Sequence, residues 1–249
     1  MSRPFVRGSS WRGLLGVLCA CCLALPAHAE LTVYAWPREP LSYQDREGKP
    51  KGLAVDILAT LMEQAGEPYR LRFAPLNRAM RAVQKKPEVC VLLLERRQER
   101  EAHYSWVGPL LISRFSLYSA NGNPLVLHDL ESAKALRVLS HMGSGVGNYL
   151  QELGFNVDYS NHNGLNPDKL MRQRAPLWAT SEVSAQVLSQ QAGLSKPYEV
   201  LPFLTVMEAM ACNVRSDRMR QQRLQQTLLA LYRSGQIQQL YQRYGVTLD

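Results

Sequence analysis

Alternating apolar and polar positions mark a series of short strands along the chain after residue 30. Residues 31–35 and 69–73 alternate with a period of two, which is the pattern of a strand with one buried face. Residues 89–94 are almost all apolar, as expected for a strand covered on both faces. Shorter strand patterns occur at residues 115–120, 136–139, 177–179 and 198–201.

Helical periodicity separates these strands. Apolar residues recur at helical spacing over residues 57–65, and Gly66 follows as a stop signal. The same reasoning predicts helices at residues 146–153, from the capping residue Asn166 onward, between 179 and 193, and on both sides of Gly235. This order of strands and helices predicts an α/β fold with a mainly parallel sheet.

Residues 1–29 have the three parts of a secretory signal peptide. Three arginines precede an apolar stretch at residues 14–25, and Ala27-His28-Ala29 follows as a cleavage site. We therefore expect cleavage after Ala29 and a mature protein in the periplasm. Lipid attachment at Cys21 is the alternative, because the residues before Cys21 loosely resemble a lipoprotein processing site.

Charge and cysteine content change this picture only slightly. The chain has 249 residues and a formal net charge of +8, and the three arginines of the signal region leave +5 for the rest. That excess is spread over short runs without a basic stripe, so we expect no nucleic-acid partner. Cys90 and Cys212 remain after cleavage, both in apolar runs, and we expect buried, reduced thiols. A disulfide is the alternative for an exported protein.

Four stretches of the chain resemble, in order, those of a known family. They are residues 51–58, Gln98-Glu99-Arg100 with Trp106-Val107-Gly108-Pro109, Gly143-Ser144-Gly145, and residues 231–237 with Leu240-Tyr241 and Tyr244-Gly245. The family is solute-binding protein family 3, the periplasmic amino-acid-binding type. The resemblance implies a two-lobed type 2 periplasmic-binding-protein fold, with two strands crossing a hinge and a small-molecule ligand in the cleft.

The resemblance also implies boundaries and partners. Lobe 1 would comprise residues 30–112 and 207–249, lobe 2 residues 113–206, and the hinges would lie near 110–114 and 205–209. An ABC-type importer would be the partner of a monomeric binding protein that needs no cofactor. Two other functions are open: an enzyme of the same fold that dehydrates cyclic carboxylic acids, and a stand-alone periplasmic sensor.

The resemblance assigns the ligand's carboxylate to Arg100, whose planar fork suits it. A solvated charge in a charged run is the alternative. Gly143, Ser144 and Gly145 lie between a strand and a helix start, where backbone N–H groups favour an anion. A plain turn is the alternative there.

Two positions depart from the family. The acid that holds an ammonium group falls at Ser181, with Glu182 beside it, and the threonine near the arginine is Glu95. We therefore expect a carboxylate or other anionic ligand that depends little on an α-amino group.

Three further residues are candidates for the ligand site. Arg78 would hold a second anionic group, and Tyr34 and Trp36 would pack against the ligand; a helix surface and the core are their alternatives. The histidines show no metal spacing, and no nucleophile is paired with a base, so we expect no metal site and no enzyme. His141 and Glu182 are the acid–base candidates if an enzyme is present after all.

Overall fold

The computed structural model describes residue 1, residues 30–120 and residues 125–246. The predicted signal peptide, its cleavage site after Ala29 and the alternative lipid site at Cys21 fall outside these residues. Within the described ranges, no helix combines the length and the apolar character needed to cross a bilayer. The first regular element begins at Leu31.

One mixed sheet of eight strands runs through the described chain in the order β4-β1-β5-β10-β6-β9-β7-β8. β1 is parallel to β4 and β5, and β7 is parallel to β8 and β9. β10 is antiparallel to β5 and β6, and β6 to β9, so the parallel pairing expected from the sequence is found only at the two ends. The strands are β1 (Leu31–Ala35), β4 (Tyr69–Phe73), β5 (Val89–Glu95), β6 (Tyr104–Ser119), β7 (Arg137–His141), β8 (Asn156–Ser160), β9 (Leu177–Ser181) and β10 (Tyr198–Asn213), with a separate pair β2 (Tyr43–Gln44) and β3 (Pro50–Lys51).

Helices cover both ends of the sheet, and the predicted α/β class is confirmed. They are α1 (Leu53–Ala65), α2 (Leu76–Lys85), α3 (Leu130–Ala133), α4 (Gly145–Glu152), α5 (Asn166–Met171), α6 (Glu182–Gln191), α7 (Arg218–Arg233) and α8 (Gln236–Arg243), with 3-10 turns η1 (Gln98–His103) and η2 (Asn163–Leu165). The predicted stops are also found, since Gly66 and Gly235 adopt left-handed backbone angles at the end of α1 and before α8.

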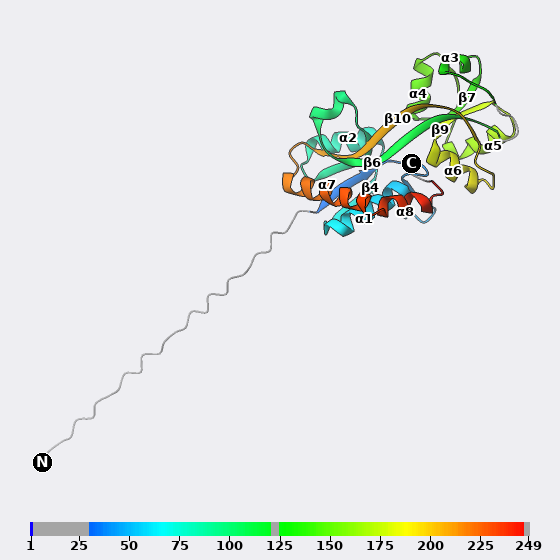
Figure 1. The fold of residues 1–249 in the computed structure, drawn as a ribbon. Coiled ribbons are helices and arrows are strands. Elements are labelled where there is room, and N and C mark those ends of the chain that lie inside the picture. The colour runs from blue at the N-terminus through cyan, green and yellow to red at the C-terminus, as the bar shows by residue number, and fades with distance from the viewer. Residues whose placement is uncertain (2–29, 121–124, 247–249) are drawn as a thin grey trace.

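Two long strands join the two ends of the molecule (Figure 1). β6 and β10 each span 16 residues and run side by side between two groups of helices. The first lobe is built from β4, β1, β5, α1, α2, α7 and α8, and the second lobe from β7, β8, β9 and α3 to α6. The lobe boundaries predicted at residues 112 and 206 fall inside β6 and β10, and they remain predictions.

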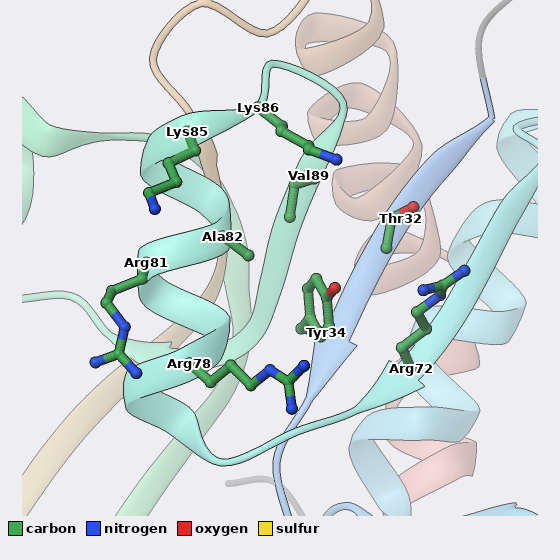
Figure 2. A pocket seen from close by; sticks show the side chains of 9 residues that line it. All are labelled: Thr32, Tyr34, Arg72, Arg78, Arg81, Ala82, Lys85, Lys86 and Val89. Atoms are coloured by element: carbon green, nitrogen blue, oxygen red, sulfur yellow. The ribbon is translucent and has the colours of Figure 1, made fainter.

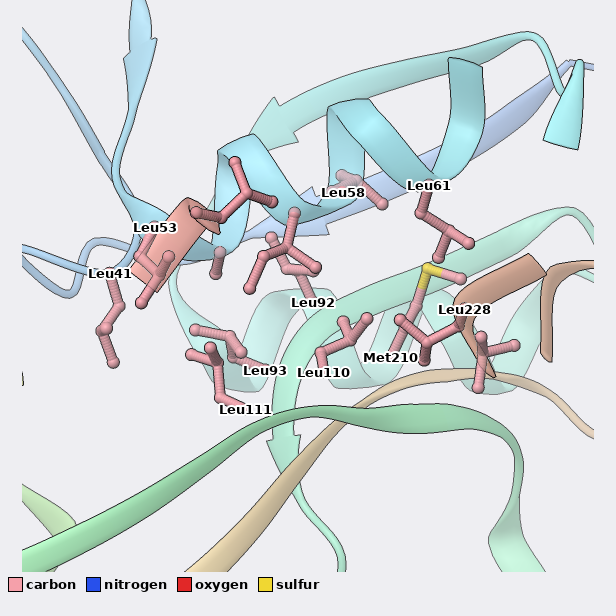
Figure 3. Close-up of a cluster of buried hydrophobic side chains, with 14 of the residues drawn as sticks. Leu41, Leu53, Leu58, Leu61, Leu92, Leu93, Leu110, Leu111, Met210 and Leu228 are labelled. Atoms are coloured by element: carbon pink, nitrogen blue, oxygen red, sulfur yellow. The ribbon is translucent and has the colours of Figure 1, made fainter. Parts of the chain in front are cut away.

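Each lobe has its own apolar interior. In the first lobe, α1, α7 and α8 pack against β1, β5 and the first part of β6 (Figure 3). In the second lobe, Trp178 and Tyr118 are fully buried among aliphatic side chains. Val183 and Val187 of α6 belong to the first-lobe cluster, so α6 also contacts the opposite lobe. The lobes are therefore closed on each other along α6.

The prediction of reduced thiols is wrong. Cys90 on β5 and Cys212 on β10 are directly opposite each other in the antiparallel ladder, and their sulfurs are bonded at 1.96 Å. Their burial was predicted correctly, because both side chains are fully buried. The pairing was missed because it depends on the register of two strands whose cysteines are separated by 122 residues.

One local prediction also needs correction. Asn166 was expected to cap a helix, but α5 begins at Asn166 and its N-cap is Leu165. The buried Asn166 amide instead donates to the Ser140 carbonyl and to the Asn163 side chain, both at 3.0 Å. Its side chain therefore ties α5 to the strand end beside it instead of closing a helix start.

Candidate functional site

A narrow cavity of about 50 Å³ lies between the two lobes. The first lobe lines it with residues that follow β1 and end β5, and the second lobe with the starts of α4 and α6. The lining residues are Trp36, Arg38, Glu39, Glu95, Phe115, His141, Gly143, Ser144, Gly145, Val146, Asn163, Ala179, Thr180, Ser181 and Ser184. Of these, Trp36, Gly143, Ser144, Gly145 and Ser181 were predicted from the sequence as ligand contacts. His141 was predicted as an acid–base candidate, and Glu95 as a departure from the family.

The start of α4 faces the cavity. Gly143 turns the chain after β7 with φ 79°, and the Ser144 hydroxyl accepts a hydrogen bond from the Gly147 N–H at 3.2 Å. The first N–H groups of a helix have no partner within the helix, and its dipole favours a negative charge there. A carboxylate already lies at this position, because a Cβ added to Gly145 would be 3.3 Å from Oε1 of Glu95. The helix start therefore faces an acid of the opposite lobe.

The start of α6 lies on the same side of the cavity. Ser181 is the N-cap residue, 3% exposed, and its hydroxyl accepts from the Ser184 N–H. Glu182 is not part of the cavity lining; its carboxylate accepts from Arg114 at 2.7 Å and from Lys196 at 3.4 Å. Of this pair of predicted residues, Ser181 faces the cavity and Glu182 is held in ion pairs outside it.

The first lobe contributes a guanidinium that sequence analysis missed. Arg38 stacks over the Trp36 ring, 5.3 Å from its centroid, and forms an ion pair with Glu208 of β10. The Glu208 side chain is completely buried and also accepts a hydrogen bond from Ser113 of β6 at 2.6 Å. Arg38 is thus fixed to the two crossing strands while its side chain remains 15% exposed to the cavity. Its place two residues after Trp36, at the end of the first strand, was the available signal.

Two residues of the cavity lining carry buried polar atoms without a hydrogen-bond partner. Nε1 of Trp36 and Nδ1 of His141 are buried and make no hydrogen bond in the described structure. Such groups are rare in folded proteins and call for a partner. Burial lowers the pKa of His141 to about 4, and the positive charge of Arg38 acts in the same direction, although the Asn163 side chain opposes it. His141 is therefore neutral at pH 7.

The other predicted residues lie elsewhere. Arg100 is in η1, outside the cavity lining, and its Nη1 donates to the Glu95 carbonyl at 3.1 Å. Tyr34 and Arg78 line a different, larger groove between α2 and the sheet (Figure 2). Their assignment to ligand binding remains a prediction. Among the described residues, no three acidic, histidine or cysteine side chains come close enough to hold a metal ion.

Comparison with known proteins relates both the sequence and the fold to other chains. The family described as bacterial extracellular solute-binding proteins, family 3, matches residues 32–247. A search of curated proteins gave no match.

Solved structures of three kinds share the fold. A histidine kinase sensor domain with similarity to periplasmic binding proteins is 16% identical, over 89% of this chain and 98% of its own, with a TM-score of 0.71. An ancestral amino-acid-binding protein, described as a precursor of cyclohexadienyl dehydratase, is 16% identical over 86% and 95%, with a TM-score of 0.66. The second substrate-binding domain of a putative amino acid ABC transporter from Streptococcus pneumoniae is 14% identical over 87% and 99%, with a TM-score of 0.69. At such identities the likeness concerns the fold, and it confirms the predicted type 2 periplasmic-binding-protein fold.

Proposed function

The chain belongs to the bacterial extracellular solute-binding proteins of family 3, and on that premise we propose that its cleft captures a small polar solute bearing a carboxylate, an amino acid or a related compound, for an ABC-type importer. One observation carries the proposal. The cleft brings together a guanidinium from the first lobe and two helix starts from the second. Each of these groups favours a negative charge, and only contact between the lobes unites them.

The carboxylate would lie between Arg38 and the start of α4. Arg38 offers a planar fork of donors, and backbone N–H groups at Gly145 and beyond offer further donors. Glu95 of the first lobe lies beside Gly145 in this closed arrangement, so a ligand carboxylate would take its place at the helix start. Ser181 cannot bind an ammonium group as a charge. The acids of the cavity lining are Glu39 and Glu95, and Glu95 is also paired with Arg97.

The size of the cavity requires the lobes to part before a solute enters. Ligand pockets usually measure about 300–1,000 Å³, and this one measures about 50 Å³. β6 and β10 are the two strands that cross between the lobes, and the predicted hinges at residues 110–114 and 205–209 lie within them. Opening would occur there, and closure would follow binding because ligand contacts come from both lobes.

The cleft supports binding over catalysis. A general base works best when its pKa is near the operating pH, whereas burial holds the pKa of His141 at about 4. Glu182, the other acid–base candidate, is engaged by Arg114 and Lys196 outside the cavity. Neither residue is poised to move a proton on a bound solute.

The first experiment is a thermal-shift screen of amino acids, other small carboxylates and amines, followed by calorimetry on the stabilising compound. Arg38→Lys keeps the charge opposite Glu208 but loses the planar fork, so we expect affinity to fall about tenfold or more, as for a lost charge-assisted hydrogen bond. Arg100→Gln tests in parallel the role implied by family resemblance. Unchanged affinity in Arg38→Lys, with a large loss in Arg100→Gln, would move the carboxylate site to Arg100.

A second experiment separates importer subunit, sensor and enzyme. Uptake of the labelled solute by cells should fall when the gene is deleted and return with the wild-type gene. Normal uptake in the deletion strain would contradict the importer role and favour a sensor. Chemical conversion of the solute by the purified protein would contradict the binding role.

A further inference from the structure

A second concave site lies on the first lobe, outside the interlobe cleft. It is a groove of about 570 Å³ between α2 and the sheet, lined by Thr32, Tyr34, Arg72, Arg78, Arg81, Ala82, Lys85, Lys86 and Val89 (Figure 2). Five of these nine residues are cations, and none is acidic. Its volume is within the usual range for a small-molecule pocket.

The groove exists because α2 covers only part of the sheet. Ala79 and Val83 of α2 pack against Val89 and Val91 of β5, and that contact leaves the same face of β1 and β4 open. The open face is polar: Tyr34 of β1 is paired in register with Arg72 of β4. The floor of the groove therefore offers the hydroxyl groups of Thr32 and Tyr34 as well as positive charge.

The cations of the groove have no acidic partners. No ion pair among the described residues involves Arg72, Arg78, Arg81, Lys85 or Lys86. The nearby acids are already engaged, because Glu30 pairs with Arg70 and Glu88 with Arg220. Like charges gathered in one hollow repel one another and raise the local concentration of anions. The groove is therefore a concentration of exposed positive charge that attracts anions.

The arrangement of the cations selects an elongated anion. Figure 2 shows the Arg78 guanidinium and the Lys86 ammonium directed from opposite ends of α2 toward β1, with Arg72 on the far side of that strand. Eight residues of helix correspond to about 12 Å along its axis. This separates the two backbone positions, so an anion with several linked phosphates meets both side chains more readily than a single phosphate does.

We propose that this groove binds a soluble anion that carries several phosphate groups. Arg78 and Lys86 bind its two ends, and Tyr34 and Thr32 donate hydrogen bonds from the floor. The site is independent of the cleft, and the cleft ligand can be identified or refuted without affecting it.

The test is calorimetry on the mature protein with inorganic tripolyphosphate at low ionic strength. We expect saturable binding with one site per chain, weakened by added salt because exposed charges are screened. Orthophosphate should bind at least tenfold more weakly, since it reaches only one end of the groove. Absence of tripolyphosphate binding, or equal affinity for orthophosphate, would overturn the proposal.

A matched pair of variants locates the site. Arg78→Gln/Lys86→Gln removes two charges from the groove, and Lys51→Gln/Arg137→Gln removes two exposed charges elsewhere. We expect the groove pair to lose about tenfold or more in affinity, as two exposed charge contacts are removed, and the control pair to stay within about twofold. An equal loss in both pairs would show a general effect of net charge and refute the groove.

Two further readouts complete the test. Tripolyphosphate should protect Lys86, but not Lys51, from chemical acetylation measured by mass spectrometry. Vesicles containing phosphatidylglycerol provide the membrane-bound form of the same phosphate chemistry. Binding to such vesicles without binding to tripolyphosphate would overturn the assignment to a soluble ligand.

Discussion

The disulfide between Cys90 and Cys212 leads to the prediction with the most clearly defined magnitude. Replacing both cysteines with alanine opens a covalent loop of 122 residues that includes the whole second lobe. In the chain-entropy account, closing a loop of this length stabilises the folded state by about 5 kcal/mol. Typical domains are stable by only about 5–15 kcal/mol, so Cys90→Ala/Cys212→Ala should lose a large fraction of its stability.

The measurement is guanidinium unfolding of the mature protein, followed by tryptophan fluorescence. Three samples are compared: oxidised wild type, wild type with reductant, and the double variant. The reduced protein and the variant should both unfold at clearly lower denaturant, with a larger dependence on denaturant because the unlinked chain expands further. The single variant Cys212→Ala is the control, since it breaks the same bond and should lose nearly as much stability.

Two results would refute this reasoning. The first is the appearance of two titratable thiols when the unreduced protein is unfolded, which would show that the cysteines are not bonded. The second is a loss of less than about 1 kcal/mol in the double variant, which would show that loop closure contributes little.

Three further predictions follow from buried contacts. Arg38→Met should lower the free energy of unfolding by about 3–5 kcal/mol, because it leaves the fully buried Glu208 without its cation. Adding Glu208→Gln should restore part of this stability, as measured by urea unfolding. Unchanged stability in the single variant would contradict the ion pair. The folded-state pKa of His141 is about 4, against 6.5 for the free side chain. The free energy of unfolding should therefore be highest above pH 6.5 and fall by up to about 3 kcal/mol toward pH 4, as the folded protein resists protonation of His141. His141→Gln should remove this part of the dependence of stability on pH. An unchanged dependence in the variant would contradict the lowered pKa. Gly52→Ala should lower the melting temperature by several degrees, because φ is 116° and the added Cβ would be 2.4 Å from the Leu41 carbonyl oxygen. The control is Gly48→Ala, at an exposed glycine that also has a positive φ but has no atom close to the added Cβ. Its melting temperature should fall less.

The sequence predicted most of the order of elements, because that order is encoded locally, but it missed α2, α3 and β8. Periodic apolar positions indicated β1, β4 and α1, a continuous apolar run indicated β5, and the glycines at 66 and 235 indicated helix ends. In β10 the alternation of apolar and polar residues is interrupted where the strand shifts register against β6, between Glu199 and Leu201 and again between Pro202 and Leu204. Only residues 198–201 of this 16-residue strand were predicted, since each shift reverses the face to which the following side chains point.

The candidate site was predicted only in its local parts. Ser144 and Ser181 each follow a strand and start a helix, so their positions could be deduced from neighbouring residues. Arg38 and Glu95 could not be assigned, because their partners come from other elements: Glu208 is 170 residues from Arg38, and Gly145 is on the opposite lobe from Glu95.

The sequence by itself therefore determined the class of fold, the family resemblance and the order of most strands and helices. The tertiary structure decided which cysteines bond, which arginine enters the cleft, and which cations gather beside α2. The reason is physical. Periodicity and capping act over a few residues, whereas a cleft, a disulfide and a charged groove arise from the pairing of β6 with β10 and from the part of the sheet that α2 leaves uncovered.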